Sequence, residues 1–244
     1  MGWAGVLELD DVTFRYEAMT MRFALSVASG EFLAVIGPSG AGKSTLLSLI
    51  AGFDRPLSGR ILAEGRDITG LPPAERPLTM LFQDHNLFAH LDVYANVGLG
   101  IHPGLKLTAA DRGRIAEALA QVGLAGMERR LPGQLSGGER QRAALARSLV
   151  RDRPLLLLDE PFAALGPALR REMLELVDRI RRERRMTVLM VTHQPEDARL
   201  AAGRTAWVED GAIRRVGPTA ALFADPGFAA LRLYLGEPPP APAA

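Results

Sequence analysis

The segment GPSGAGKST, from Gly37 to Thr45, constrains the fold of this chain more than any other part of its sequence. It matches the pattern G-x-x-x-x-G-K-[S/T] without a mismatch. The apolar run FLAVI before it predicts a buried strand, and a helix is predicted from about Lys43 to Ala51, where Gly52 ends it. A strand, a glycine-rich turn and a helix in this order predict an α/β domain with a phosphate-binding loop.

The residues of this loop have separate predicted roles. Its glycines let backbone N–H groups approach phosphate, and the following helix adds the positive end of its dipole. We expect Lys43 to contact the β- and γ-phosphates of a nucleotide and Ser44 to bind Mg²⁺. The alternative is a glycine-rich turn without a ligand. The predicted nucleotide contacts are Gly37, Pro38, Ser39, Gly40, Ala41, Gly42, Lys43, Ser44 and Thr45.

A second apolar run, LLLLDE, ends in the adjacent carboxylates of Asp159 and Glu160. The run predicts a buried parallel strand. We expect Asp159 to hold Mg²⁺ through water, and Glu160 to orient or deprotonate the water that attacks the γ-phosphate. General-base help of this kind is worth ~10²–10⁴ in rate. Alone, the pair is equally typical of an exposed acidic turn, but beside a complete phosphate-binding loop it predicts phosphoryl transfer.

Other apolar runs predict the rest of the core. Between about residues 84 and 130 the pattern becomes helical, which predicts a helical segment inserted between strands. A mostly parallel sheet covered on both sides is therefore predicted. The expected strands are Val6–Leu9, Val12–Tyr16, Met21–Val27, Leu78–Gln83 and Thr187–His193, with a hairpin at Trp207–Val216; helices are expected around Ile115–Val122 and Leu169–Ile180.

The stretch QLSGGERQR, at Gln134–Arg142, predicts a second anion-binding turn at the start of a helix. Its plain structural interpretation is a capping box, in which Ser136 caps the helix and Glu139 is the third helical residue. Both interpretations are compatible. A GTPase would need the base-reading pattern N-K-x-D, which is absent, and a metabolic P-loop kinase would not explain this second turn.

Together these motifs closely resemble those of the ATP-binding cassette (ABC) ATPases, whose signature motif is similar to LSGGERQR. The resemblance implies a P-loop NTPase with a mostly parallel core sheet, an N-terminal antiparallel β subdomain and an inserted helical subdomain. It also implies that Ser136, Gly137, Gly138 and Glu139 bind the ATP of a second copy in a head-to-tail homodimer. Loops of two chains that are related by a twofold axis can contact the same γ-phosphate. The implied domain is 1–235, with its helical subdomain at about 84–152, before a disordered Pro/Ala tail at 236–244.

The resemblance assigns roles to single residues as well. It implies that Gln83 contacts Mg²⁺ and water, that His193 contacts the γ-phosphate, and that Tyr16 stacks on adenine, which is worth ~1–3 kcal/mol. An edge-strand aromatic is the alternative for Tyr16, and a structural role is the alternative for His193. Gly166 stands where the family has Asp, and Ala163 where it has Ser; these departures put the coupling of the two ATP sites in doubt.

A single cassette resembles the ATP-binding subunits of bacterial importers. The resemblance implies membrane permease subunits as partners, gripped through Phe88, Leu91 and Val93, and a periplasmic solute-binding protein as an indirect one. Core packing is an equally good interpretation of each of these residues. The implied location is the cytoplasmic face of the inner membrane, as a peripheral subunit.

The segments YEAMTMRFALSVASGE, RPLTMLFQDHNLFAHL and VGLGIHPGLKLTAADR are most similar to the thiamine importer group. Iron(III) or polyamine importers are the alternative. Sugar, sulfate and molybdate cassettes commonly carry a further regulatory domain.

Composition narrows the remaining function classes. A net charge of +1 gives no bulk attraction to nucleic acid, so no nucleic-acid partner is expected. Without cysteines, disulfides, thiolate catalysis and cysteine-bound zinc are excluded. We see neither a secretory signal nor an apolar run near the ~18 residues of a membrane span. A cassette acting on nucleic acid or ribosomes stays open as a less favoured alternative.

Overall fold

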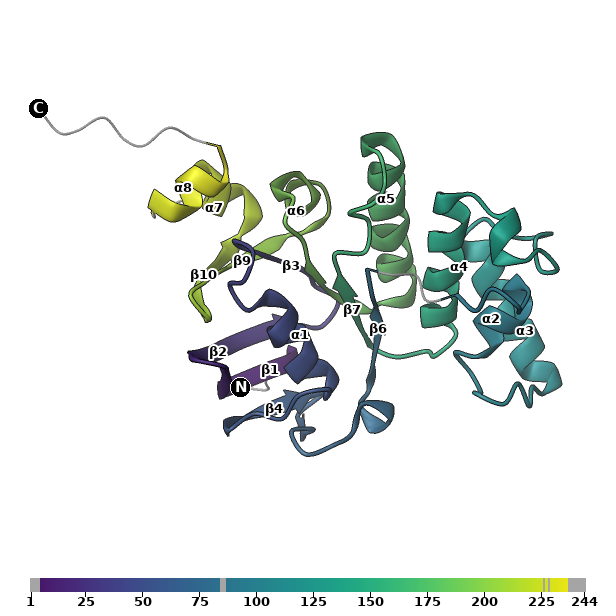
Figure 1. The fold of residues 1–244 in the computed structure, drawn as a ribbon, viewed down its shortest axis with the longest axis horizontal. Coiled ribbons are helices and arrows are strands. Elements are labelled where there is room, and N and C mark those ends of the chain that lie inside the picture. The colour runs from purple at the N-terminus through teal and green to yellow at the C-terminus, as the bar shows by residue number, and fades with distance from the viewer. Residues whose placement is uncertain (1–4, 84–86, 226, 228, 237–244) are drawn as a thin grey trace, which may run out of the picture. The chain divides into compact units, whose positions relative to one another are not determined.

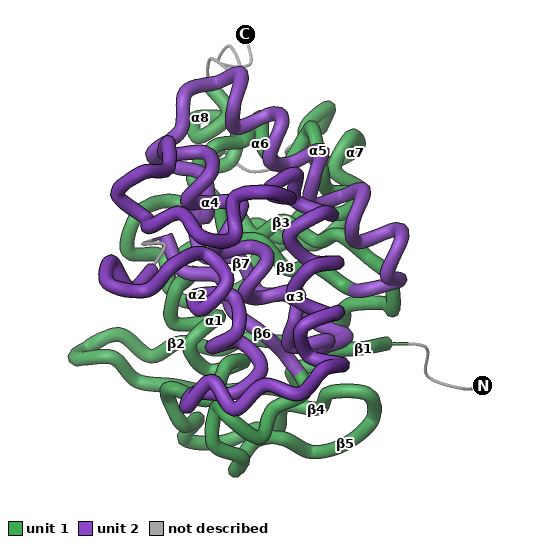
Figure 2. Tube along the Cα trace, turned by 90° about the vertical axis from the view of Figure 1, so that its right-hand side faces the viewer, with its two compact units in different colours: residues 1–77, 187–244 green, residues 78–186 purple. Residues whose placement is uncertain are grey.

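The computed structural model describes residues 5–83, 87–225, 227 and 229–236. These fall into two compact units, one of residues 1–77 and 187–244 and one of residues 78–186, which we call unit 1 and unit 2 (Figure 2). Residues 237–244 of the expected disordered tail lie outside the described residues.

Unit 1 begins with an antiparallel β region (Figure 1). Its strands are β1 (Gly5–Tyr16), β2 (Met19–Ala28), β4 (Ser58–Ala63) and β5 (Arg66–Asp67), in the order β5-β4-β1-β2. The two expected runs before Tyr16 form one strand, because irregular pairing between Leu9 and Val12 accommodates Asp11 at φ 52°. The alternating burial of β2 fits a sheet with one covered face.

The core of unit 1 is built on β3 (Phe32–Ile36), which pairs in parallel with β8 (Thr187–Val191) and β9 (Arg204–Glu209). Every residue of β3 and β8 is buried, which explains their continuous apolar sequences. Strand β10 (Ala212–Pro218) returns antiparallel to β9. The predicted hairpin is confirmed, since Asp210 and Gly211 both have positive φ.

The helices of unit 1 pack on this core. Helix α1 (Lys43–Ala51) contacts β8, α6 (Pro195–Ala201) contacts β3, and α7 (Thr219–Ala224) contacts β9 and β10; α8 (Ala229–Tyr234) follows. The predicted stop of α1 is confirmed, because Gly52 adopts a left-handed conformation at φ 86°.

A buried arginine completes the end of α1. Arg76 follows the 3₁₀ turn η1 (Pro73–Glu75) and is only 1% exposed. Its guanidinium donates to the carbonyl oxygens of Leu49 and Ile50 at 2.7 Å, and to those of Thr69 and Leu71 at 3.0 Å. Burial lowers the pKa of Arg76 from its usual value. The side chain thus satisfies the carbonyls that a helix end leaves without partners.

Unit 2 holds the parallel pair β6 (Leu78–Leu81) and β7 (Leu155–Asp159), followed by α5 (Pro167–Arg184). Between β6 and β7 the described chain contains no strand but α2 (Val93–Gly98), α3 (Ala109–Gln121), the 3₁₀ turn η2 (Pro132–Gln134) and α4 (Gly137–Leu149). Strand β6 is shorter than expected, because pairing with β7 ends at Leu81. In the described part of the chain, no helix has both the length and the apolarity to cross a bilayer.

Candidate nucleotide site

The glycine-rich loop of unit 1 connects β3 to α1 and is shaped by close backbone packing. A Cβ at Gly37 would lie 2.1 Å from the carbonyl oxygen of Val208, so only glycine fits there. Gly42 caps α1 with φ 101°, which a side chain rarely allows. The loop therefore presents its backbone at the start of a helix, as an anion site requires.

Lys43 is folded into this loop. The side chain is 6% exposed, and its ammonium donates to the carbonyl oxygens of Gly37 and Pro38, both at 2.7 Å. A phosphate oxygen would be a stronger acceptor than these neutral carbonyls, because it carries charge. Ser44, the next residue, is exposed. The loop thus holds one positive charge where a phosphate would enter.

Asp159 and Glu160 lie at the carboxyl end of β7 in unit 2, and both are half-buried. Glu160 adopts a left-handed backbone conformation, with φ 44°. Such a conformation costs a residue with a side chain about 1–3 kcal/mol and is concentrated at functional sites. Gln83 lies beyond the end of β6 in the same unit and is exposed.

The signature stretch forms the start of α4. Ser136 caps this helix and Glu139 reaches back to it: the Ser136 N–H donates to the Glu139 carboxylate at 2.7 Å, and the Glu139 N–H donates to the Ser136 hydroxyl at 3.2 Å. The expected capping box is therefore confirmed. Hydrogen bonds from the backbone N–H and the hydroxyl of Ser136 to the carboxylate, with Arg130 nearby, hold the pKa of Glu139 below its usual range.

His193 follows β8, and two side-chain hydrogen bonds hold the loop in which it lies. The Tyr234 hydroxyl of α8 donates to the His193 carbonyl oxygen at 2.8 Å, while the Tyr234 ring packs edge-on against buried Trp207 at 5.0 Å. The Thr192 hydroxyl donates to the buried Asp197 carboxylate at 2.9 Å. The His193 residue itself is exposed.

The candidate residues are divided between the units. Tyr16, which is 59% exposed at the end of β1, lies in unit 1 with the glycine-rich loop and His193. Gln83, the acidic pair and the signature stretch lie in unit 2. Each unit therefore contributes a separate group of candidates.

The segment before α2 is organised by Asn96, for which no sequence motif predicted a role. Asn96 is fully buried; its side-chain amide donates to the carbonyl oxygens of Phe88 and Leu91, and its oxygen accepts the Phe88 N–H at 2.8 Å. Phe88 is 50% exposed and Leu91 half-buried. Val93 is only 1% exposed, so core packing, the alternative interpretation, is correct for this residue, and the prediction that it contacts a permease is wrong. Val93 is the first residue of α2, and its side chain is buried there.

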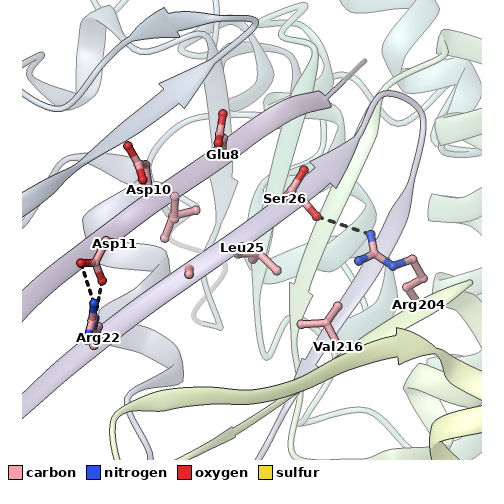
Figure 3. A pocket seen from close by; sticks show the side chains of 10 residues that line it. Glu8, Asp10, Asp11, Arg22, Leu25, Ser26, Arg204 and Val216 are labelled. Atoms are coloured by element: carbon pink, nitrogen blue, oxygen red, sulfur yellow. Dashed lines mark hydrogen bonds and ion pairs between the residues drawn. The ribbon is translucent and has the colours of Figure 1, made fainter. Parts of the chain in front are cut away.

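A hollow of about 640 Å³ lies elsewhere in unit 1, on β1 and β2 (Figure 3). Asp11 and Arg22 form an ion pair on its wall, and Arg204 donates to the Ser26 carbonyl oxygen at 3.4 Å. None of the predicted nucleotide contacts lines this hollow. Asp10 pairs instead with Arg60, and Arg204 with Glu31, neither of which lines the hollow. The hollow is therefore separate from the candidate nucleotide contacts.

The family model described as ABC transporter matches residues 21–163. The chain belongs to the ABC transporter family. Membership confirms the predicted class of activity, an ATP-hydrolysing transporter ATPase. Because ABC ATPases bind ATP, it also confirms ATP as the nucleotide.

Named relatives of this ABC ATPase cover nearly its full length. A thiamine import ATP-binding protein ThiQ of Cereibacter sphaeroides is 60% identical over 231 residues, 95% of this chain and 100% of that protein. The protein of the same name from Photobacterium profundum is 55% identical and covers 90% of this chain and 91% of its own. The predicted resemblance to the thiamine importer group is thus confirmed.

Solved ABC cassettes share the fold. The ADP conformation of a cassette of an ABC transporter has a TM-score of 0.86 at 24% identity, covering 96% of this chain and 99% of its own. A dimeric cassette in a post-hydrolysis state with ADP and Pi has a TM-score of 0.74 at 29% identity, covering 87% and 98%. The predicted P-loop NTPase fold, with its mostly parallel core and N-terminal antiparallel region, is confirmed.

Proposed function

We propose that this chain is the ATP-hydrolysing subunit of an importer for thiamine and its phosphates. The observation that carries the proposal is the 60% identity across the whole of a thiamine import ATP-binding protein. The transported solute would not contact this subunit, so whole-chain similarity is the appropriate argument for it. The helical segment at about 84–152 would be an inserted subdomain of one cassette spanning 1–235.

The candidate residues would have separate roles in ATP binding and hydrolysis. The glycine-rich loop and Lys43 would bind the phosphates, and Tyr16 would stack on adenine. Glu160 would orient and deprotonate the attacking water, with Gln83 beside that water and His193 at the γ-phosphate. Three kinds of support exist: the complete loop motif, the buried Lys43 ammonium inside the loop, and the unusual backbone of Glu160.

The chemistry of the available donors fits Mg²⁺. Hydroxyl, carboxylate and amide oxygens are the ligands this ion prefers. Ser44 and Gln83 are exposed and Asp159 is half-buried, so we infer that these residues would hold the ion, Asp159 through water. When bound, Mg²⁺ supplies positive charge that offsets the charge of the phosphates.

The functional form would be a head-to-tail homodimer. Ser136, Gly137, Gly138 and Glu139 would cap the ATP bound by the partner copy, since they form the start of α4, and the start of a helix attracts anions. The dimeric state of the solved cassette with ADP and Pi supports dimerisation.

The membrane partner would be a permease, with a periplasmic solute-binding protein acting through it. We propose that exposed Phe88 and half-buried Leu91 contact the permease, on a segment that Asn96 holds in place. The subunit would then be peripheral, at the cytoplasmic face of the inner membrane.

Uptake of labelled thiamine by a strain lacking this gene tests the proposal. Complementation with the natural sequence should restore uptake, and complementation with Glu160→Gln should not. Labelled iron(III) and a polyamine serve as parallel substrates. Restoration of either one in place of thiamine would refute thiamine as the solute. ATPase activity stimulated by nucleic acid, without permease in a pull-down, would refute the transport function.

A further inference from the structure

Side chains at the start of helix α4 contact both the loop after β7 and helix α5, all within unit 2. Gly138 packs so tightly against Leu169 that an added Cβ would lie 2.8 Å from a methyl carbon of that leucine. Arg142 forms an ion pair with Glu172 at 2.5 Å. The start of α4 and the first turns of α5 are therefore in direct contact.

Gln141 makes the most informative of these contacts. Its side-chain amide donates a hydrogen bond to the carbonyl oxygen of Pro161, the residue directly after Glu160. The side chain is only 1% exposed. Its own oxygen has no hydrogen-bond partner among the described residues, although it is buried. Burying an unsatisfied amide oxygen is costly, so the stability of the fold does not explain a glutamine at this position.

The loop that receives this hydrogen bond starts from an unfavourable backbone conformation. Glu160 has φ 44°, which only surrounding contacts can maintain. Arg170 of α5 holds the remainder of the loop, donating to the carbonyl oxygens of Phe162, Ala163 and Leu165 at 3.2–3.3 Å. Gln141 therefore secures the part of the loop nearest Glu160, and Arg170 secures the part nearest α5.

We propose that Gln141 is a positioning residue for Glu160, through which the signature turn of a subunit sets the conformation of that subunit's own hydrolytic loop. Gln141 lies on the second turn of the helix that Ser136 caps. Movement of the signature turn when it closes on the partner's ATP would pass through one hydrogen bond to the residue after Glu160. The inference rests on the proposed function, because it requires Glu160 to act on ATP.

Within unit 2, the contact from Gln141 to Pro161 connects the two functional motifs directly.

The test compares Gln141→Met with Ser148→Ala in the full-length protein. Methionine keeps the length and burial of glutamine but cannot donate a hydrogen bond. Ser148 is the matched control, because it is a buried polar residue of the same helix, and among the described residues its hydroxyl bonds only to the Ala144 carbonyl oxygen of that helix. We expect Gln141→Met to lower kcat about tenfold, to bring the Hill coefficient for ATP close to 1, and to leave ATP affinity and Tm nearly unchanged. Ser148→Ala should leave all four values near those of the natural sequence.

The outcomes separate the two hypotheses. If the natural sequence hydrolyses ATP and Gln141→Met matches it in kcat and Hill coefficient, the positioning role is refuted. A fall in kcat that is matched by a large fall in Tm would also refute it, since Gln141 would then be merely structural. If the natural sequence hydrolyses no ATP, the proposed function itself fails.

Discussion

The hydroxyl of Tyr234 donates a hydrogen bond to the carbonyl oxygen of His193, 41 residues earlier in the chain, at 2.8 Å. The last described helix thereby fixes the loop that carries a proposed γ-phosphate contact. Tyr234→Phe should remove this bond and keep the ring contact with Trp207. We expect a loss of about 0.5–1.5 kcal/mol in the free energy of unfolding, the usual net value of one hydrogen bond. Urea denaturation measures this loss of free energy.

Tyr94→Phe is the control, because the structure shows no hydrogen bond from the Tyr94 hydroxyl to a described residue. An equal loss of stability in both variants would contradict the prediction.

Arg76→Met should destabilise the protein strongly. Methionine has a similar length but leaves the carbonyl oxygens of Leu49, Ile50, Thr69 and Leu71 without their donor. Because each buried unsatisfied group costs about 1–3 kcal/mol, and water can reach part of the site, we expect a total loss of about 2–4 kcal/mol. Thermal or urea unfolding checks this value. Exposed Arg179 on α5 offers a matched control, and Arg179→Met should change stability by less than about 0.5 kcal/mol.

Gly166→Asp should stabilise the protein by a few tenths of a kcal/mol. Gly166 caps α5 without a side-chain hydrogen bond, at φ −64° and ψ 159°, and no atom lies within 4 Å of a Cβ built there. An aspartate can therefore cap the helix without strain. Gly166→Ala adds the Cβ without a hydrogen-bond acceptor. The free energy of unfolding of the aspartate variant should therefore exceed that of the alanine variant by about 0.5–2 kcal/mol. Equal stability of the two variants would show that the cap does not form.

Lowering the pH should weaken the caps at the starts of α4 and α3. Glu139 accepts hydrogen bonds from Ser136, and Asp111 from Thr108; each cap holds the pKa of its carboxyl below the usual value of 4.5 or 3.8. A depressed pKa stabilises the folded state fully above the usual value, and the contribution is lost as pH falls through the depressed one. Stability should thus fall below about pH 4.5. The double variant Glu139→Gln, Asp111→Asn should show a shallower fall in urea titrations between pH 5 and pH 3; identical slopes would refute the assignment.

Several features of the fold follow from local sequence. The run FLAVI, the loop from Gly37 and the helix from Lys43 occur as predicted, because strand burial, loop backbone and helix start each depend on neighbouring residues. The capping box of Ser136 and Glu139 occurs as predicted for the same reason, because its two partners are only three positions apart. Short or weakly patterned elements, such as β4, α2, α6 and α7, carry too little periodicity to be predicted.

Contacts between side chains that are far apart in the chain could not be predicted from the sequence. The glycine-rich loop, the acidic pair and the capped turn at Ser136 were determined by sequence alone, because each is a short motif that lies within a few residues. Only the tertiary structure decided that Arg76 donates to the carbonyl oxygens at the end of α1, that Gln141 holds the residue after Glu160, and that Val93 is buried. Each of these depends on which atoms the fold brings within hydrogen-bond or van der Waals distance, and no local pattern encodes that proximity.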